Sequence, residues 1–124
     1  MDNQAAISFL EKWAPNGPWS LTAIQTDRKS ITTKTFRPET KPDLLAWLEL
    51  HNGKRNLYFH VNPTLMDISK KAEREDIKEL AWLHVDIDPR AGEDIAGEQA
   101  RALGLLTTNL PKGVPAPTCV VFSG

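Results

Sequence analysis

Residues 19–36 read WSLTAIQTDRKSITTKTF, two runs rich in β-branched and aromatic side chains that flank the polar sequence DRKS. Runs of this composition favour β-strands, and a short polar connection between them favours a turn. The sequence PNGP directly upstream interrupts any regular element before the first run. We therefore predict a β-hairpin whose strands comprise residues 19–26 and 31–36.

A helix is predicted on each side of this hairpin. Residues 3–14 place apolar side chains at helical spacing, and a polar residue at position 2 or 3 can cap the first turn. Residues 40–53 begin with Thr40 as a candidate cap, carry a proline in the first turn and end at Gly53. Both segments are therefore expected to pack against the hairpin.

Beyond residue 53, apolar runs alternate with amphipathic or charged segments. Strands are predicted at residues 56–61, 81–88 and 116–122, and helices at residues 70–80 and 94–108. Such alternation is typical of an α/β or α+β domain in which helices pack on a sheet. We predict one domain of this class over residues 1–124, with a mixed sheet flanked by helices.

The composition narrows the classes of function. The 124 residues suit one domain, and a net charge of −1 excludes a general electrostatic attraction to nucleic acid. No apolar stretch approaches the roughly 20 residues that cross a bilayer, and the N-terminus lacks a signal peptide's features. The single Cys119 lies in the apolar run TCVVF, which predicts a buried thiol. These features favour a cytoplasmic protein with no membrane partner.

Two aspartates lie in the predicted strand AWLHVDID, which Pro89 ends. Alternate strand residues share a face, so Asp86 and Asp88 would project together, with Cα atoms roughly 6.5–7 Å apart. Carboxylates at this spacing can converge on a hard divalent cation, which offsets the cost of burying them. We predict a Mg²⁺ or Mn²⁺ site at Asp86 and Asp88.

Plainer interpretations of these residues remain open. The two aspartates can be exposed residues that cap a turn or pair with Arg90. His84 lies on the same face of the predicted strand, where it can contact a nucleotide or be a half-buried, hydrogen-bonded residue. Trp82 is expected in the core.

Basic residues gather around the hairpin. Residues 28–41 contain five lysines and arginines and one acidic residue. A local basic patch can bind the phosphates of DNA, and the candidates are Lys29, Lys34 and Arg37. The alternative is a solvated hairpin surface. Three tryptophans, at positions 13, 19 and 47, are expected in the core rather than stacked on bases.

An apolar strand that ends in DID resembles the first motif of the archaeo-eukaryotic primase superfamily, in particular the primase-polymerases of phages and plasmids. The upstream sequence NLYFHVNP and the downstream sequence PAPTCVVFSG resemble the flanking elements of that family. The resemblance covers roughly residues 55–124. It implies the first part of a catalytic core, with an N-terminal α/β module over residues 1–53 and the start of a metal-binding, RNA-recognition-like module over residues 54–124.

The resemblance also implies roles for individual residues and partners. Asp86 and Asp88 would bind catalytic Mg²⁺ or Mn²⁺, and Ser123 would open the loop that contacts the phosphates of the incoming nucleotide. Nucleoside triphosphates, a single-stranded DNA template and a replicative helicase domain or protein would be the partners. The setting would be the cytoplasm of a bacterial cell or a phage-infected host.

The sequence ends before the remainder of that loop and before the third acidic residue of the family. We expect the chain to be the first part of a longer nucleotidyltransferase, truncated after Gly124, that folds but does not polymerise alone. Two other enzyme classes use an Asp-x-Asp motif: metal-dependent glycosyltransferases, and phosphatases with an aspartate nucleophile. A non-enzymatic alternative is a replication-associated DNA-binding module in which the aspartates are structural.

Overall fold

The computed structural model describes residues 2–27 and 29–121, which fall into two compact units, Met1–His84 and Val85–Gly124. The N-terminal unit contains α1 (Asn3–Trp13), β1 (Trp19–Ile24), β2 (Ile31–Phe36), α2 (Lys41–His51) and β3 (Asn56–Phe59). The C-terminal unit contains α3 (Ile95–Leu106). Two short 3₁₀ turns, Pro38–Thr40 and Arg74–Asp76, lie in the N-terminal unit. The chain is therefore a mixed α and β protein, as predicted.

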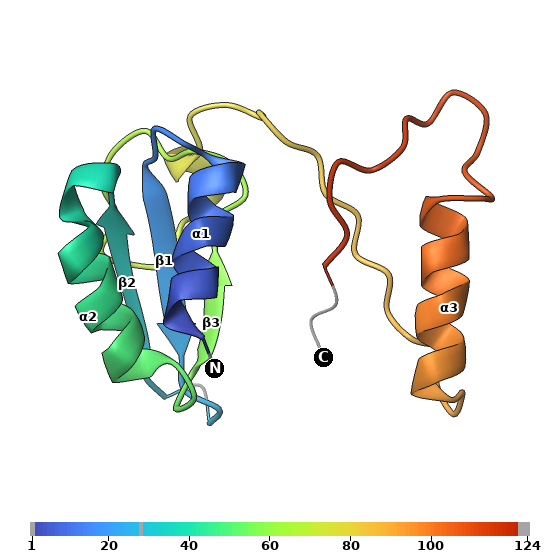
Figure 1. The fold of residues 1–124 in the computed structure, drawn as a ribbon, viewed down its shortest axis with the longest axis horizontal. Helices are drawn as coiled ribbons and strands as arrows, with labels where there is room; N and C mark the ends of the chain where they lie inside the picture. The colour runs from blue at the N-terminus through green and yellow to red at the C-terminus, as the bar shows by residue number, and fades with distance from the viewer. Residues whose placement is uncertain (1, 28, 122–124) are drawn as a thin grey trace. The chain divides into compact units, whose positions relative to one another are not determined.

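The three strands form an antiparallel sheet in the order β2-β1-β3 (Figure 1). The predicted hairpin is confirmed, with Trp19 opposite Phe36 and Ile24 opposite Ile31. Its first strand ends at Ile24 rather than at residue 26, and the Gln25 N–H donates to the Ser30 carbonyl just beyond the last strand pair. β1 is thus the central strand, paired along both edges.

Helices α1 and α2 cover one face of this sheet (Figure 1). Phe36, Leu44 and Leu48 are the largest side chains that lie fully buried between them. Burying a large apolar side chain contributes about 1.5–3 kcal/mol. Apolar residues of α1, β1 and α2 complete the core: Ile7, Leu10, Trp19, Leu21, Ala23 and Trp47.

The two predicted helix starts in this unit differ in their capping. Asp2 caps α1, because its carboxylate accepts hydrogen bonds from the N–H groups of Gln4 and Ala5. Thr40 precedes α2 but its side chain does not cap that helix. Its hydroxyl accepts from the Arg37 N–H and donates to the Arg37 carbonyl, which closes the preceding 3₁₀ turn.

The predicted helix over residues 70–80 is wrong, and Arg74–Asp76 forms a single 3₁₀ turn instead. The Asp76 carboxylate accepts from the Glu73 N–H at 2.9 Å, so a side chain replaces a helical backbone partner. Ile77 is also held by an antiparallel bridge to Thr64. These local contacts compete successfully with a helix that has no continuous apolar stripe.

The strands predicted at residues 81–88 and 116–122 are not formed in the part of the chain that the structure describes, which ends at residue 121. A strand requires a hydrogen-bonded neighbour, and apolar composition alone does not supply one. Leu83 is 88% exposed and Val85 is 74% exposed, so these side chains also lack an apolar surface to cover them. β3, predicted to open the second module, pairs with β1 and belongs to the sheet of the N-terminal unit.

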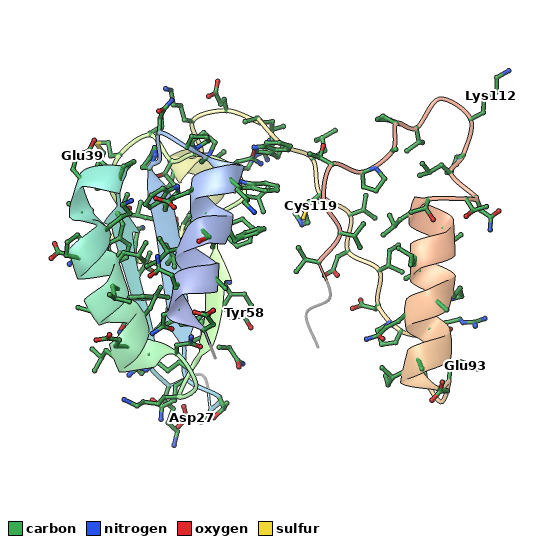
Figure 2. The ribbon with its side chains drawn as sticks, in the orientation of Figure 1. Asp27, Glu39, Tyr58, Glu93, Lys112 and Cys119 are labelled. Atoms are coloured by element: carbon green, nitrogen blue, oxygen red, sulfur yellow. The ribbon has the colours of Figure 1, made fainter. Side chains whose placement is uncertain are left out.

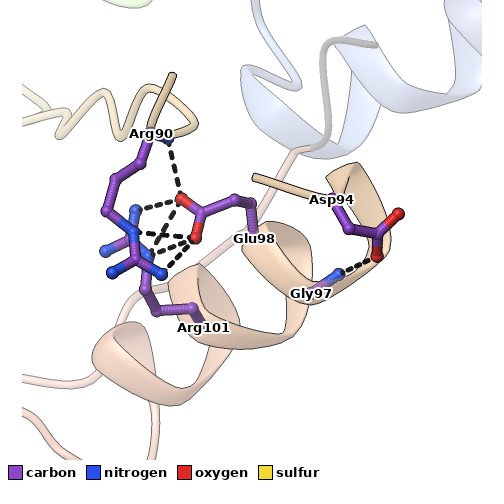
Figure 3. Close-up of polar contacts among 5 residues, drawn as sticks. All are labelled: Arg90, Asp94, Gly97, Glu98 and Arg101. Atoms are coloured by element: carbon purple, nitrogen blue, oxygen red, sulfur yellow. Dashed lines mark hydrogen bonds and ion pairs between the residues drawn. The ribbon is translucent and has the colours of Figure 1, made fainter. Parts of the chain in front are cut away.

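The helix predicted at residues 94–108 is confirmed as α3. The Asp94 carboxylate accepts from the Gly97 N–H at 2.9 Å and caps it (Figure 3). Among the residues described, no helix combines the length and the apolar character required to cross a membrane.

Candidate functional site

Asp86 and Asp88 lie in the segment that leads from residue 85 to α3, and both are exposed. They line one pocket of the C-terminal unit, with a volume of about 220 Å³. Its other walls come from the neighbours of the two aspartates, from one side of α3, and from Val120 and Val121. The two candidate ligands therefore line the same pocket, although neither residue lies in a β-strand.

The carboxylates that line this pocket are the type of ligand that a hard cation prefers, but they are few. Carboxylate oxygens are preferred ligands of Mg²⁺, which is usually held by one or two carboxylates together with water and substrate phosphates. Within residues 2–27 and 29–121, no group of three or more histidine, cysteine or acidic side chains comes together to hold a metal. The metal role of Asp86 and Asp88 stays a prediction.

Glu98, on the first turn of α3, accepts hydrogen bonds from two arginines (Figure 3). The backbone N–H of Arg90 donates to Oε2 at 2.8 Å, and its guanidinium donates to Oε1 through Nε at 2.9 Å and Nη2 at 2.7 Å. Arg101 donates to Oε2 through Nε at 3.0 Å and Nη2 at 2.8 Å. We call Arg90, Glu98 and Arg101 the Glu98 clamp.

The Glu98 clamp is charged and lies at the surface. Glu98 is only 4% exposed, while the side chains of Arg90 and Arg101 that pair with it remain 61% and 30% exposed. Hydrogen bonds from Arg101, and then from Arg90, hold the pKa of Glu98 far below its ordinary value. Glu98 is therefore ionised at neutral pH.

The clamp attaches the chain to α3 two residues after Asp88. Because Pro89 restricts the backbone between them, the position of Arg90 limits where Asp88 can lie. Arg90 pairs with Glu98 rather than with either aspartate, which overturns the alternative in which it neutralises Asp86 or Asp88. Sequence reasoning missed Glu98. Its spacing of three residues from Arg101 was the available signal.

The chain before the aspartates is attached to the N-terminal unit through Asn62, which sequence reasoning also missed. Its Nδ2 donates to the Trp82 carbonyl at 3.0 Å, and its Oδ1 accepts from the Trp82 N–H at 2.7 Å. The Trp82 ring lies 4.4 Å from the Trp13 ring, centroid to centroid. Trp82 is thus half-buried at the edge of the core, four residues before Asp86.

The predicted nucleotide contacts at His84 and Ser123 stay predictions. His84 is exposed, so the alternative of a half-buried, hydrogen-bonded histidine is wrong. Ser123 lies outside the described residues. Cys119, labelled in Figure 2, is exposed, which contradicts the predicted buried thiol. The surrounding segment lacks the sheet that would have covered it.

The three candidate DNA-binding residues differ in what surrounds them. The Arg37 guanidinium forms two hydrogen bonds with the Asp67 carboxylate, at 2.8 and 2.6 Å. The Lys34 ammonium lies 5.3 Å from the centre of the Phe36 ring. The backbone N–H of Lys29 donates to Asp27 in the turn. Arg37 is therefore already neutralised by a carboxylate.

The predicted core role of the tryptophans is confirmed for Trp19 and Trp47, which are buried. Trp13 is half-buried and packs edge to face against Phe59 at 5.6 Å between centroids. Its Nε1–H donates to the Val61 carbonyl at 3.4 Å. These tryptophans serve the packing of the N-terminal unit.

Comparison with protein-family models, curated proteins and solved structures finds no match to this chain.

Proposed function

We propose that this chain is the N-terminal part of a phage- or plasmid-type primase-polymerase that transfers nucleotides in a divalent-metal-dependent reaction. Asp86 and Asp88 are the proposed metal ligands. The observation that carries the proposal is that both carboxylates line one pocket. The resemblance of the surrounding sequence to the primase superfamily supplies the reaction class.

The charges around the pocket favour a cation. Three carboxylates and one guanidinium line it, those of Asp86, Asp88, Glu98 and Arg101. The balance stays negative when Arg90, which is bonded to Glu98, is included. A site of this charge attracts divalent cations and repels a free triphosphate, so the metal is expected to bind before or with the nucleotide.

Each part of the pocket has a separate task in this proposal. The aspartates hold the cation, and the Glu98 clamp limits the movement of the segment that carries them. A cation bound there would activate a terminal 3′-hydroxyl and neutralise the charge on the triphosphate. His84 and Ser123 are proposed nucleotide contacts, and Lys29, Lys34 and Arg37 are proposed contacts to a single-stranded DNA template.

Metal binding is the first test, because it uses the 124-residue chain itself. Mn²⁺ should broaden the NMR signals of residues 85–89, and Asp86→Asn or Asp88→Asn should remove that broadening. Asp27→Asn, a change of the same kind at another exposed aspartate, serves as the control and should leave the broadening intact. Equal broadening in the wild type and both variants would refute the metal site.

Primer synthesis by the full-length parent, with Mg²⁺ or Mn²⁺, is the second test. Asp86→Ala and Asp88→Ala should abolish synthesis, because each removes a ligand from a site that has few. The 124-residue chain alone should be inactive. Undiminished synthesis in either variant would instead favour a structural role for the aspartates, as in a replication-associated DNA-binding module.

A further inference from the structure

The face of the sheet away from α1 and α2 is polar and partly covered. The register places Ser20 opposite Thr35 and Thr22 opposite Thr33 on this face, and the hydroxyls of each pair are 2.9 Å apart. The Ile68 N–H donates to Thr35 Oγ1 at 3.1 Å, so the chain after β3 crosses one part of the face. The remaining part forms a pocket with a volume of about 550 Å³.

Hydrogen-bonding groups without any carboxylate line this second pocket. Thr22 and Tyr58 contribute from the sheet, and His60 and Lys71 contribute from the chain that follows β3. Ile24 and Ile31 add an apolar wall, and neither aspartate nor glutamate occurs in the lining. Its volume lies in the range of small-molecule sites, which combine apolar walls with a few polar groups.

His60 is held in place and kept neutral. Its Nε2 lies 3.3 Å from Thr22 Oγ1, and the buried Thr22 hydroxyl also bonds to Thr33. Burial, and secondarily the charge of Lys71, lower the pKa of His60 below its ordinary value. Lys71 and His60 line the same pocket.

Lys71 supplies the positive charge of this pocket. Among the described residues it forms no ion pair, whereas its neighbour Lys70 pairs with Glu73 at 3.3 Å. A lone ammonium beside neutral hydrogen-bonding groups favours an anion that accepts several hydrogen bonds. Tyr58, labelled in Figure 2, lines the pocket and is 52% exposed, so its side chain is accessible to an apolar part of such a ligand.

We propose that this pocket binds a small oxyanion, a carboxylate or a phosphate, through Lys71 and His60, with its apolar part against Tyr58 and Ile24. The pocket belongs wholly to the N-terminal unit. None of these residues is assigned to nucleotidyl transfer, so this inference stands or falls separately from the proposed function.

Acetate, benzoate and inorganic phosphate are the probes, titrated into the 124-residue chain at constant ionic strength and followed by NMR. The signals of His60 and Tyr58 should shift and saturate. Lys71→Met should weaken binding about tenfold, the equivalent of one charge-assisted hydrogen bond. Because Lys71 is exposed, this variant is expected to fold. Lys70→Met, which removes the neighbouring charge, should leave the affinity unchanged.

The probes also identify the source of the oxyanion. Tighter binding of benzoate than of acetate would assign the site to carboxylates with an apolar body, and preference for phosphate would assign it to phosphates. An absence of saturable shifts with all three probes would overturn the proposal. Equal weakening by Lys70→Met and Lys71→Met would also overturn it, because only the general surface charge would then be responsible.

Discussion

The N-terminal unit excludes water from a continuous set of apolar side chains on two helices and a sheet, whereas the described part of the C-terminal unit buries only Glu98. In the latter, apolar side chains such as Val85, Leu103 and Val121 remain exposed. Two regions of one chain therefore rely on different interactions. Hydrophobic burial maintains the first, and the second depends on one helix and a cluster of charged hydrogen bonds.

This difference has consequences for stability. Apolar burial contributes about 25 cal/mol per Å² and accumulates over a core, whereas ion pairs at the surface are weakened by water and salt. An isolated short helix is also marginal in water. The C-terminal unit is therefore expected to open at lower denaturant concentration and to exchange its amide protons faster.

The largest effect is expected for Leu44→Ala, which removes a fully buried side chain from the N-terminal unit. The free energy of unfolding of this unit should fall by about 2–5 kcal/mol, because the substitution leaves a cavity in a packed core. Leu103→Ala on α3 is the matched change at a 43% exposed position and should cost no more than about 0.5 kcal/mol. Denaturant titration measures both. A comparable loss in Leu103→Ala would show that the C-terminal unit has a core of its own.

Glu98→Gln should have the next largest effect, confined to the C-terminal unit. The substitution keeps the shape of the side chain but removes the negative charge of the carboxylate that accepts hydrogen bonds from Arg90 and Arg101. Amide exchange at Arg90 and along α3 should accelerate, while exchange in β1 stays unchanged.

Glu93→Gln is the control for this experiment, because Glu93 is an exposed glutamate in the turn before α3 (Figure 2). It should leave exchange at Arg90 unaltered. Unchanged exchange at Arg90 in Glu98→Gln would show that the clamp does not hold this segment in solution.

Acid should weaken the two units over different pH ranges. Burial is the main cause, and nearby positive charges the second, that lower the pKa of His60 and His51 below the ordinary value of 6.5. As the pH falls, these histidines therefore take up protons in the unfolded chain before they do so in the folded one. The N-terminal unit should therefore lose stability as pH falls below about 6.5. Glu98 also has a lowered pKa. It therefore stabilises the C-terminal unit fully above pH 4.5, the ordinary pKa of a glutamate, and this stabilisation is lost as the pH falls below 4.5.

Unfolding measured at several pH values tests this separation. His60→Gln should reduce the loss of stability between pH 7 and pH 5, and His51 should account for the part that remains. If His60→Gln leaves the slope unchanged, His60 is not held neutral by its surroundings.

The smallest effect is expected for Glu11→Gln. Lys41 donates to Glu11 at 2.7 Å between α1 and α2, but both side chains are more than one third exposed. The free energy of unfolding should fall by about 0.2–1 kcal/mol, less at high salt. A loss as large as that of Leu44→Ala would contradict the view that burial, rather than charge, maintains the N-terminal unit.

Secondary structure was predicted best from the sequence where a segment with a clear local pattern also has another element to pack against. The hairpin, α1 and α2 have apolar faces that meet one another, so periodicity located them to within a few residues. Residues 81–88 have an equally strong strand composition, yet they form none because composition does not supply a hydrogen-bonded neighbour. The helix predicted at residues 70–80 failed for a related reason, since acidic side chains satisfy the local backbone.

The candidate site was predictable only in part. The Asp-x-Asp pattern singled out two carboxylates that do line one pocket. The residues that hold their segment, Asn62 and Glu98, were missed because each bonds to a residue outside its own element, and the spacing of Glu98 from Arg101 indicates only a pair within α3. Asn62 bonds to a backbone 20 residues away, and Glu98 to one eight residues away. Neither spacing belongs to a regular element.

The contact between Asn62 and Trp82 also bears on how the protein ages. An asparagine loses its amide most readily when the backbone nitrogen of the next residue attacks the side chain. Pro63 has no N–H, so this route is closed at Asn62. Deamidation there would replace the amide nitrogen that donates to the Trp82 carbonyl with a carboxylate oxygen, which cannot donate. Asn16 and Asn52 each precede a glycine and have no such protection, so chemical damage on storage should begin at these two positions.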